Sequence, residues 1–228
     1  MCIPAWNEER IIAESAAAVR DALKKIRPDC RVVVAVNGST DRTAERARKV
    51  NGISVLTIPT RGKGAAVVAA ARASFADIFG FIDADLSTPP SSIRELFLLV
   101  QNDACDIAIG SRLIDKSTVR RGILRTLTSE VFNVLRRGLI GIKVLDTQCG
   151  LKLMNERGRE ILAGCEEKGW FFDIEFLARA EKSGLRIREV PVPWNEYHYP
   201  GRKAKLRILR DGIESIRAMI RIRGRLSH

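Results

Sequence analysis

The stretch FGFIDADLSTPP, residues 79–90, joins an apolar run to two aspartates and a proline pair. The apolar run 79–82 predicts a buried strand, and the prolines predict a helix soon afterwards. Asp83 and Asp85 flank one alanine at the strand end, so both side chains can turn into the same cleft. Two carboxylates at this spacing suit a hard cation, Mg²⁺ or Mn²⁺, shared with a diphosphate. The alternative is a pair of loop aspartates that caps the following helix.

Three more predicted strands precede this one, and helical patterns separate them. Apolar runs rich in β-branched residues occupy 2–4, 31–36 and 53–58, and helical patterns occupy 8–26, a region starting near residue 41, and 63–75. This alternation predicts an α/β fold with a mostly parallel central sheet and helices on both faces. Ligands of such sheets bind at the carboxyl ends of the strands.

Each of the four strands runs directly into a polar cluster, and we expect these clusters to meet at one rim of the sheet. They read PAWNEE (4–9), NGSTD (37–41), PTRGKG (59–64) and DADLSTPP (83–90). In the third cluster, Gly62 and Gly64 surround Lys63 where a helix begins, so backbone amides and an ammonium would approach a phosphate. An ordinary loop-to-helix turn is the alternative. The spacing matches neither a Walker loop nor G-x-G-x-x-G.

The later sequence has a looser pattern. We expect a helix at 91–101, a strand at 107–110, an Arg-rich helical region at 120–137, an irregular segment DTQCGLKLM at 146–154, a helix at 172–183, a strand at 186–191, a loop at 192–203 and a basic helix to the end. The predicted organisation is one domain, 1–228, with a first half (1–112) that carries the four polar clusters, a second half (113–203) and a basic amphipathic helix (204–228). The first strand is expected to be short.

Composition excludes several classes of protein. The 228 residues are 46% hydrophobic and 29% charged, which excludes a disordered or fibrous chain. Five cysteines without a C-x-x-C pair suggest neither a zinc site nor a disulfide framework, and favour a reducing compartment. The two histidines lie at 198 and 228, which disfavours histidine-centred catalysis. A net charge of +12 points to a polyanionic partner, a phosphorylated substrate or an acidic membrane surface.

The positive charge is concentrated near the end of the chain. From Arg202 onward, nine Lys or Arg stand against two acidic residues, and apolar residues recur at helical spacing at 206, 209, 213, 216 and 220. This is typical of a basic amphipathic helix on an anionic bilayer, and region 120–137 has a similar pattern. A core-packed helix with a solvated arginine flank is the alternative. A nucleic-acid-binding protein would also explain the charge, but acidic clusters at one rim disfavour it.

Taken together, the four clusters resemble those of inverting nucleotide-sugar glycosyltransferases of the GT-A fold, in the polyprenyl-phosphate sugar synthase branch. The resemblance implies that Pro4, Ala5, Trp6, Asn7, Glu8, Asn37 and Lys63 bind the nucleotide sugar. It also implies that Asp83, Ala84 and Asp85 bind the diphosphate, with the metal held by the two aspartates. The family's aspartate pair in the second motif is Val36-Asn37 here. An amide therefore replaces a carboxylate beside the nucleobase, and uridine versus guanosine stays open.

The segments DTQCGLKLM and GWFFDIEF are most similar to the dolichyl-phosphate glucosyltransferase subgroup, with the mannosyltransferases next. The resemblance implies transfer of glucose from UDP-glucose to dolichyl phosphate, with GDP-mannose as the second donor. A phosphate monoester is largely ionised at pH 7, so it needs positive charge more than a base. Arg112, with Arg125 and Arg202, is predicted to hold it. For a glycan hydroxyl acceptor, Asp173 would be the base, and its alternative role is structural.

These inferences predict peripheral attachment to the cytoplasmic face of a membrane and no nucleic-acid partner. The predicted catalytic set is Asp83, Asp85, Arg112 and Asp173.

Overall fold

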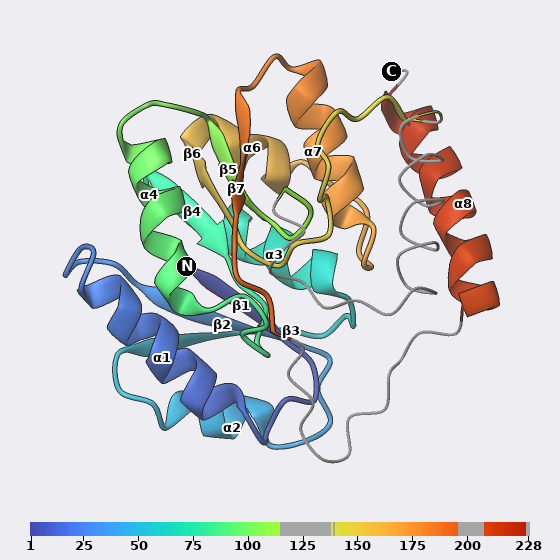
Figure 1. Cartoon of the computed structure of the whole chain (residues 1–228). Coiled ribbons are helices and arrows are strands. Elements are labelled where there is room, and N and C mark those ends of the chain that lie inside the picture. The colour runs from blue at the N-terminus through green and yellow to red at the C-terminus, as the bar shows by residue number, and fades with distance from the viewer. Residues whose placement is uncertain (115–137, 139, 196–207, 227–228) are drawn as a thin grey trace.

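The structure is a computed structural model, and it describes residues 1–114, 138, 140–195 and 208–226, with side chains of the last helix from Ser215 onward (Figure 1). The strands are β1 (Cys2–Ala5), β2 (Val32–Asn37), β3 (Ile53–Ile58), β4 (Ile78–Phe81), β5 (Ile107–Ser111), β6 (Lys152–Asn155) and β7 (Ile187–Pro191). The helices are α1 (Ile12–Lys24), α2 (Thr43–Arg48), α3 (Lys63–Arg72), the short 3₁₀ helix η1 (Pro90–Ser92), α4 (Ile93–Gln101), α6 (Glu156–Ala163), α7 (Phe172–Lys182) and α8 (Ile208–Leu226).

The seven strands form one sheet in the order β3-β2-β1-β4-β6-β5-β7. Every described neighbour pair is parallel except the two pairs that β6 makes with β4 and β5. The predicted α/β class and mostly parallel sheet are therefore confirmed. Because β6 runs the other way, its first residue lies at the rim where the parallel strands end.

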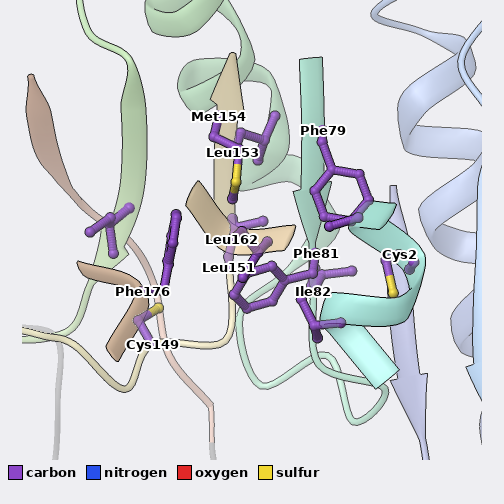
Figure 2. Close-up of a cluster of buried hydrophobic side chains, with 14 of the residues drawn as sticks. Cys2, Phe79, Phe81, Ile82, Cys149, Leu151, Leu153, Met154, Leu162 and Phe176 are labelled. Atoms are coloured by element: carbon purple, nitrogen blue, oxygen red, sulfur yellow. The ribbon is translucent and has the colours of Figure 1, made fainter. Parts of the chain in front are cut away.

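Helices cover both faces of the sheet, as predicted. α3, α6 and α7 pack on one another over one face, while α1, α2 and α4 cover the other. α8 packs beside α7 at the edge of the molecule (Figure 1). Figure 2 shows part of the core, where Phe79 and Phe81 of β4 meet Leu151 and Leu153 of the β6 region among buried side chains.

The described structure differs from the prediction in three places. The helix predicted from residue 8 begins at Ile12, because the backbone of residues 8 and 9 is bound to the α2 region instead. The segment 146–154 was expected to be irregular, but its last part is the central strand β6. A lysine in a short apolar run usually indicates a position that faces solvent, but the side chain of Lys152 is fully buried. Helix α6 was not predicted, and the Arg-rich region 120–137 lies outside the described residues.

Within the described residues, no helix is both long and apolar enough to span a lipid bilayer.

Candidate active site

The first two polar clusters interlock at the rim. Asn7, in a left-handed conformation with φ 54°, donates from its backbone to Ser39 Oγ at 3.0 Å. The Asn7 Oδ1 atom accepts from the Thr40 backbone at 2.8 Å. Asp41 receives the Glu9 backbone amide at 3.1 Å. Several polar groups of these clusters therefore form hydrogen bonds that connect the loop after β1 to the loop after β2.

A cation–aromatic pair stands beside them. The guanidinium carbon of Arg61 lies 3.6 Å from the centroid of the Trp6 ring, which joins the loop after β1 to the loop after β3. Gly38 lies beneath this contact with φ 63°, and a Cβ there would come within 3.1 Å of the Arg61 backbone nitrogen. Asn37 is only 3% exposed at the end of β2. The predicted nucleoside-binding residues Pro4, Ala5, Trp6, Asn7, Glu8 and Asn37 thus all lie at the ends of β1 and β2.

A row of alternating charges leads from the core to the rim. The Lys152 ammonium lies 2.6 Å from one oxygen of Asp173, and the other oxygen lies 4.0 Å from Lys63. Lys63 in turn contacts Asp83 at 2.7 Å. Burial lowers the pKa of Lys63, but the carboxylates of Asp83, Asp173 and Asp85 outweigh it and raise that pKa overall. Lys63 is therefore a fixed positive charge in contact with the first aspartate of the DAD motif.

The Gly-Lys-Gly segment differs from the prediction. The backbone amides of Gly64 and Ala65 donate to the carbonyl oxygens of Gly169 and Lys168, at 3.2 and 3.0 Å. A Cβ on Gly64 would lie 2.3 Å from the Glu167 carbonyl oxygen, so the glycine permits this close approach. The amides of Gly64 and Ala65 are therefore not free for a phosphate, because the loop before α7 already occupies them.

Asp83 and Asp85 supply carboxylate oxygens, which are the ligands that Mg²⁺ and Mn²⁺ prefer. Both are half-buried on either side of the buried Ala84, directly after the end of β4. One oxygen of Asp83 contacts Lys63, and one oxygen of Asp85 accepts from the Ser87 backbone at 3.1 Å. Among the described residues there is no cluster of three or more potential metal ligands. A cation here would therefore need oxygens from a substrate or water to complete its shell.

Arg112 lies at the end of β5, on the same rim, as predicted. Its Nε and Nη2 atoms donate to the two oxygens of Asp146 at 2.8 and 2.7 Å, and its backbone amide adds a third hydrogen bond. Burial opposes both charges, yet the contact holds the pKa of Arg112 above and that of Asp146 below their ordinary values. The guanidinium side chain is 21% exposed, and its carbon lies 5.8 Å from the Trp194 ring centroid.

Asp173 is deeply buried, with 1% exposure. Burial raises the pKa of its carboxyl group, against the opposing effect of Lys152 and Lys63. Because both of its oxygens face lysines, this geometry favours the structural role over the role of a base. Glu175, two residues further along α7, is also fully buried and points elsewhere, to Arg179 at 2.7 Å.

Two predicted acceptor residues, Arg125 and Arg202, lie outside the described residues. The structure adds three residues that the sequence patterns did not single out, namely Asp146, Gly150 and Lys152. A Cβ on Gly150 would lie 2.1 Å from Asp83 Oδ2, so this glycine leaves room for the aspartate. A lysine inside the apolar run LKLM was the signal that could have identified Lys152.

Residues 1–160 match the protein family described as Glycosyl transferase family 2. Similar curated proteins include a dolichyl-phosphate beta-glucosyltransferase of Trichomonas vaginalis, 32% identical over 90% of this chain and 67% of that protein. The dolichyl-phosphate beta-glucosyltransferase of Saccharomyces cerevisiae is 29% identical over 97% of this chain and 72% of that protein. Glycosyltransferase AglD of Haloferax volcanii is 31% identical over 92% of this chain, which spans only 34% of its length.

Among solved structures, glucosyl-3-phosphoglycerate synthase from Mycobacterium tuberculosis is similar. Its complex with Mn²⁺ and uridine-diphosphate-glucose gives a TM-score of 0.68 at 24% identity, covering 98% of this chain and 78% of that chain. The likeness confirms the predicted GT-A fold.

Proposed function

Because this chain belongs to glycosyl transferase family 2 and is a nucleotide-sugar hexosyltransferase, we propose that it transfers glucose, with inversion, to a polyprenyl or dolichyl phosphate. UDP-glucose is the proposed donor. Asp83 and Asp85 hold Mg²⁺ or Mn²⁺, and the reaction takes place at the cytoplasmic face of a membrane.

One observation carries the proposal. The two aspartates that suit a metal–diphosphate follow β4, and a clamped guanidinium that suits a phosphate follows β5. Only the antiparallel strand β6 separates these strands, so the residues that we propose for the donor and for the acceptor follow strands that are close together in the sheet.

The acceptor chemistry agrees with the residues present. A phosphate monoester has a second pKa near ~6, so at pH 7 it is already an anionic nucleophile. Nε and Nη2 of Arg112 are held by Asp146, which orients the guanidinium before any acceptor arrives. When bound, a divalent cation would neutralise charge that builds on the leaving diphosphate. No base is needed, which agrees with the burial of Asp173.

The donor is tested by product analysis after incubation with UDP-glucose or GDP-mannose, a polyprenyl phosphate and Mg²⁺ or Mn²⁺. We expect a β-linked glucosyl lipid phosphate, because several relatives are named dolichyl-phosphate beta-glucosyltransferases. Calorimetric titration with UDP and GDP in Mn²⁺ gives a second measurement. Tighter binding of GDP would reverse the donor, and transfer to a soluble glycan instead of the lipid would favour the alternative with Asp173 as base.

Metal dependence is tested with Asp85→Ala and Asp85→Asn. Loss of a carboxylate that binds the metal should lower the rate about a hundredfold to a thousandfold. Asp29→Ala is the control, because this aspartate has a 68% exposed side chain far from the rim and a single partner, Arg27. Undiminished transfer by Asp85→Ala, or full activity in excess chelator, would contradict the proposal.

Helix α8 supports the membrane part of the proposal, because Ile216 and Ile220, the two residues of the predicted apolar stripe whose side chains are described, face outward. Its buried face is formed by Ser215, Ala218, Met219 and Ile222, whereas Ile216 and Ile220 are 42% and 60% exposed. Arg217 and Arg223 are exposed on the same helix. An outward face with isoleucines among arginines suits an anionic lipid surface, where each basic group adds about 1 kcal/mol.

Flotation with anionic and neutral liposomes tests this surface. We expect binding to anionic vesicles that fades with salt, and weaker binding by Ile220→Glu. Phe75→Glu is the matched control, because Phe75 is an exposed apolar residue (94%) outside α8. It precedes the first residue of β4, at the end of the sheet opposite to the rim with the polar clusters. Equal binding to both vesicle types, or equal losses in the two variants, would remove the membrane part. The cytoplasmic face agrees with five free cysteines and is tested by protease protection in sealed vesicles.

A further inference from the structure

Lys152 is a fully buried lysine whose ammonium is completely engaged. Its Nζ atom donates to Asp173 Oδ1 at 2.6 Å, to the Cys149 carbonyl oxygen at 2.7 Å and to the Thr147 carbonyl oxygen at 3.0 Å. A lysine ammonium has three N–H donors, so all of them are used. Two of the three bonds hold the backbone of the loop 146–150.

That loop touches both proposed halves of the site. At its start, Asp146 clamps Arg112 through two side-chain hydrogen bonds. At its end, Gly150 lies so close to Asp83 that a Cβ would approach the carboxylate to 2.1 Å. A shift of the loop would therefore move the guanidinium and disturb the aspartate together.

The sheet places Lys152 between the strands that carry these two residues. In the pairing register, Lys152 lies opposite Phe81 of β4 and opposite Ile109 of β5. Asp83 follows Phe81 by two positions, and Arg112 follows Ile109 by three. Lys152 thus lies between the two strands, and its side chain holds the loop 146–150, which touches both Arg112 and Asp83.

We propose that Lys152 is a positioning residue that sets the guanidinium of Arg112 and the carboxylate of Asp83 relative to each other. It does so by binding two loop carbonyls, and Asp173 balances its charge. The assay of this role by transfer rate rests on the proposed function, but the position of the loop can be measured without any substrate.

The test compares three variants. Lys152→Met fills a similar volume without the donors, and should lower kcat/KM about tenfold to a hundredfold, as expected for a small misplacement of reacting groups. It also leaves Asp173 as an uncompensated buried carboxylate, so the variant is repeated together with Asp173→Asn. The double variant should regain thermal stability but not activity. Asp173→Asn alone keeps an acceptor for the lysine but leaves the buried ammonium without its balancing charge, so it should be less stable than the double variant.

Hydrogen exchange of the backbone amides in 146–150 gives the readout that needs no substrate. We expect faster exchange in this loop in both variants that lack the lysine. Lys49→Met is the control, because Lys49 is a 73% exposed lysine on α2. The proposal is overturned if the double variant recovers both stability and activity, or if the loop exchanges at the parent rate in the variants that lack the lysine. An inactive parent with the expected exchange pattern would count against the proposed function and not against the role of Lys152.

Discussion

Gly150 illustrates how one hydrogen in place of a methyl group can shape the site. The Cβ of an alanine would lie 2.1 Å from Asp83 Oδ2 and 2.4 Å from its Cγ, a distance at which one group must move. We predict that Gly150→Ala reduces transfer at least tenfold and weakens Mn²⁺-dependent UDP binding in a calorimetric titration. Gly164→Ala is the control, because its nearest neighbour would be at 3.5 Å. Parent-like binding in Gly150→Ala would contradict this account of the glycine.

The pair Asp106–Arg186 predicts a specific dependence of stability on pH. The Arg186 hydrogen bond lowers the pKa of Asp106 from an ordinary 3.8 to about 2. Since the native pKa is the lower one, the stabilisation is complete above about pH 4 and is lost as the pH falls toward 2. Its size is about 1–2 kcal/mol, discounted because the Arg186 side chain is 51% exposed.

Chemical denaturation at pH 6, 4 and 2.5 measures this effect. Asp106→Asn should be less stable than the parent at pH 6, and the difference in unfolding free energy should shrink as the pH falls. A difference that is constant across this range would show that the charge of Asp106 is not what stabilises the fold.

At the scale of elements, the start of α7 holds the start of α3. Glu175 is fully buried, and its carboxylate accepts the backbone amides of Glu166 and Glu167 at 3.1 and 2.7 Å. The same short loop supplies the carbonyl oxygens that bind Gly64 and Ala65 at the start of α3. Lys63, and with it the contact to Asp83, depends on this chain of elements.

We predict that Glu175→Ala costs about 3 kcal/mol of unfolding free energy, because Arg179 and two backbone amides lose a buried partner. Urea denaturation gives the measurement. Glu160→Ala, at an exposed position on α6, should change stability by less than about 0.5 kcal/mol. Similar losses in the two variants would mean that the loop is not held through Glu175.

For the molecule as a whole, the reactivity of the cysteines measures whether the core excludes a reagent from solvent. Four of the five are buried, and Cys30 is the half-buried exception. Burial also raises the pKa of Cys2 to about 12, so little thiolate forms there at neutral pH. We predict that an alkylating reagent at pH 8 modifies Cys30 well before the others in the native protein, and all five after denaturation. Mass spectrometry of digested samples locates the label, and rapid native labelling of Cys2 or Cys149 would contradict the packing.

Much of the fold was determined by the sequence alone. Alternating apolar runs and helical patterns predicted the strands and helices of the first 112 residues to within a few positions, because hydrophobic periodicity is a local property. The same logic placed four polar clusters at strand ends, and the meeting of Asp83, Lys63 and Arg112 on one rim followed from parallel strand direction.

The tertiary structure decided how those residues are engaged. The buried strand β6, its lysine and the clamp of Arg112 by Asp146 join residues 21 to 34 positions apart, and no local pattern marks such pairs. From the sequence, a lysine in a strand is expected to be exposed, and only the structure reveals the partners that allow Lys152 to be buried. In the same way, the amide of Gly64 is expected to be free for a phosphate, and only the structure shows that a loop occupies it. Periodicity reports which side of an element is apolar, whereas long-range packing determines which polar groups find each other inside.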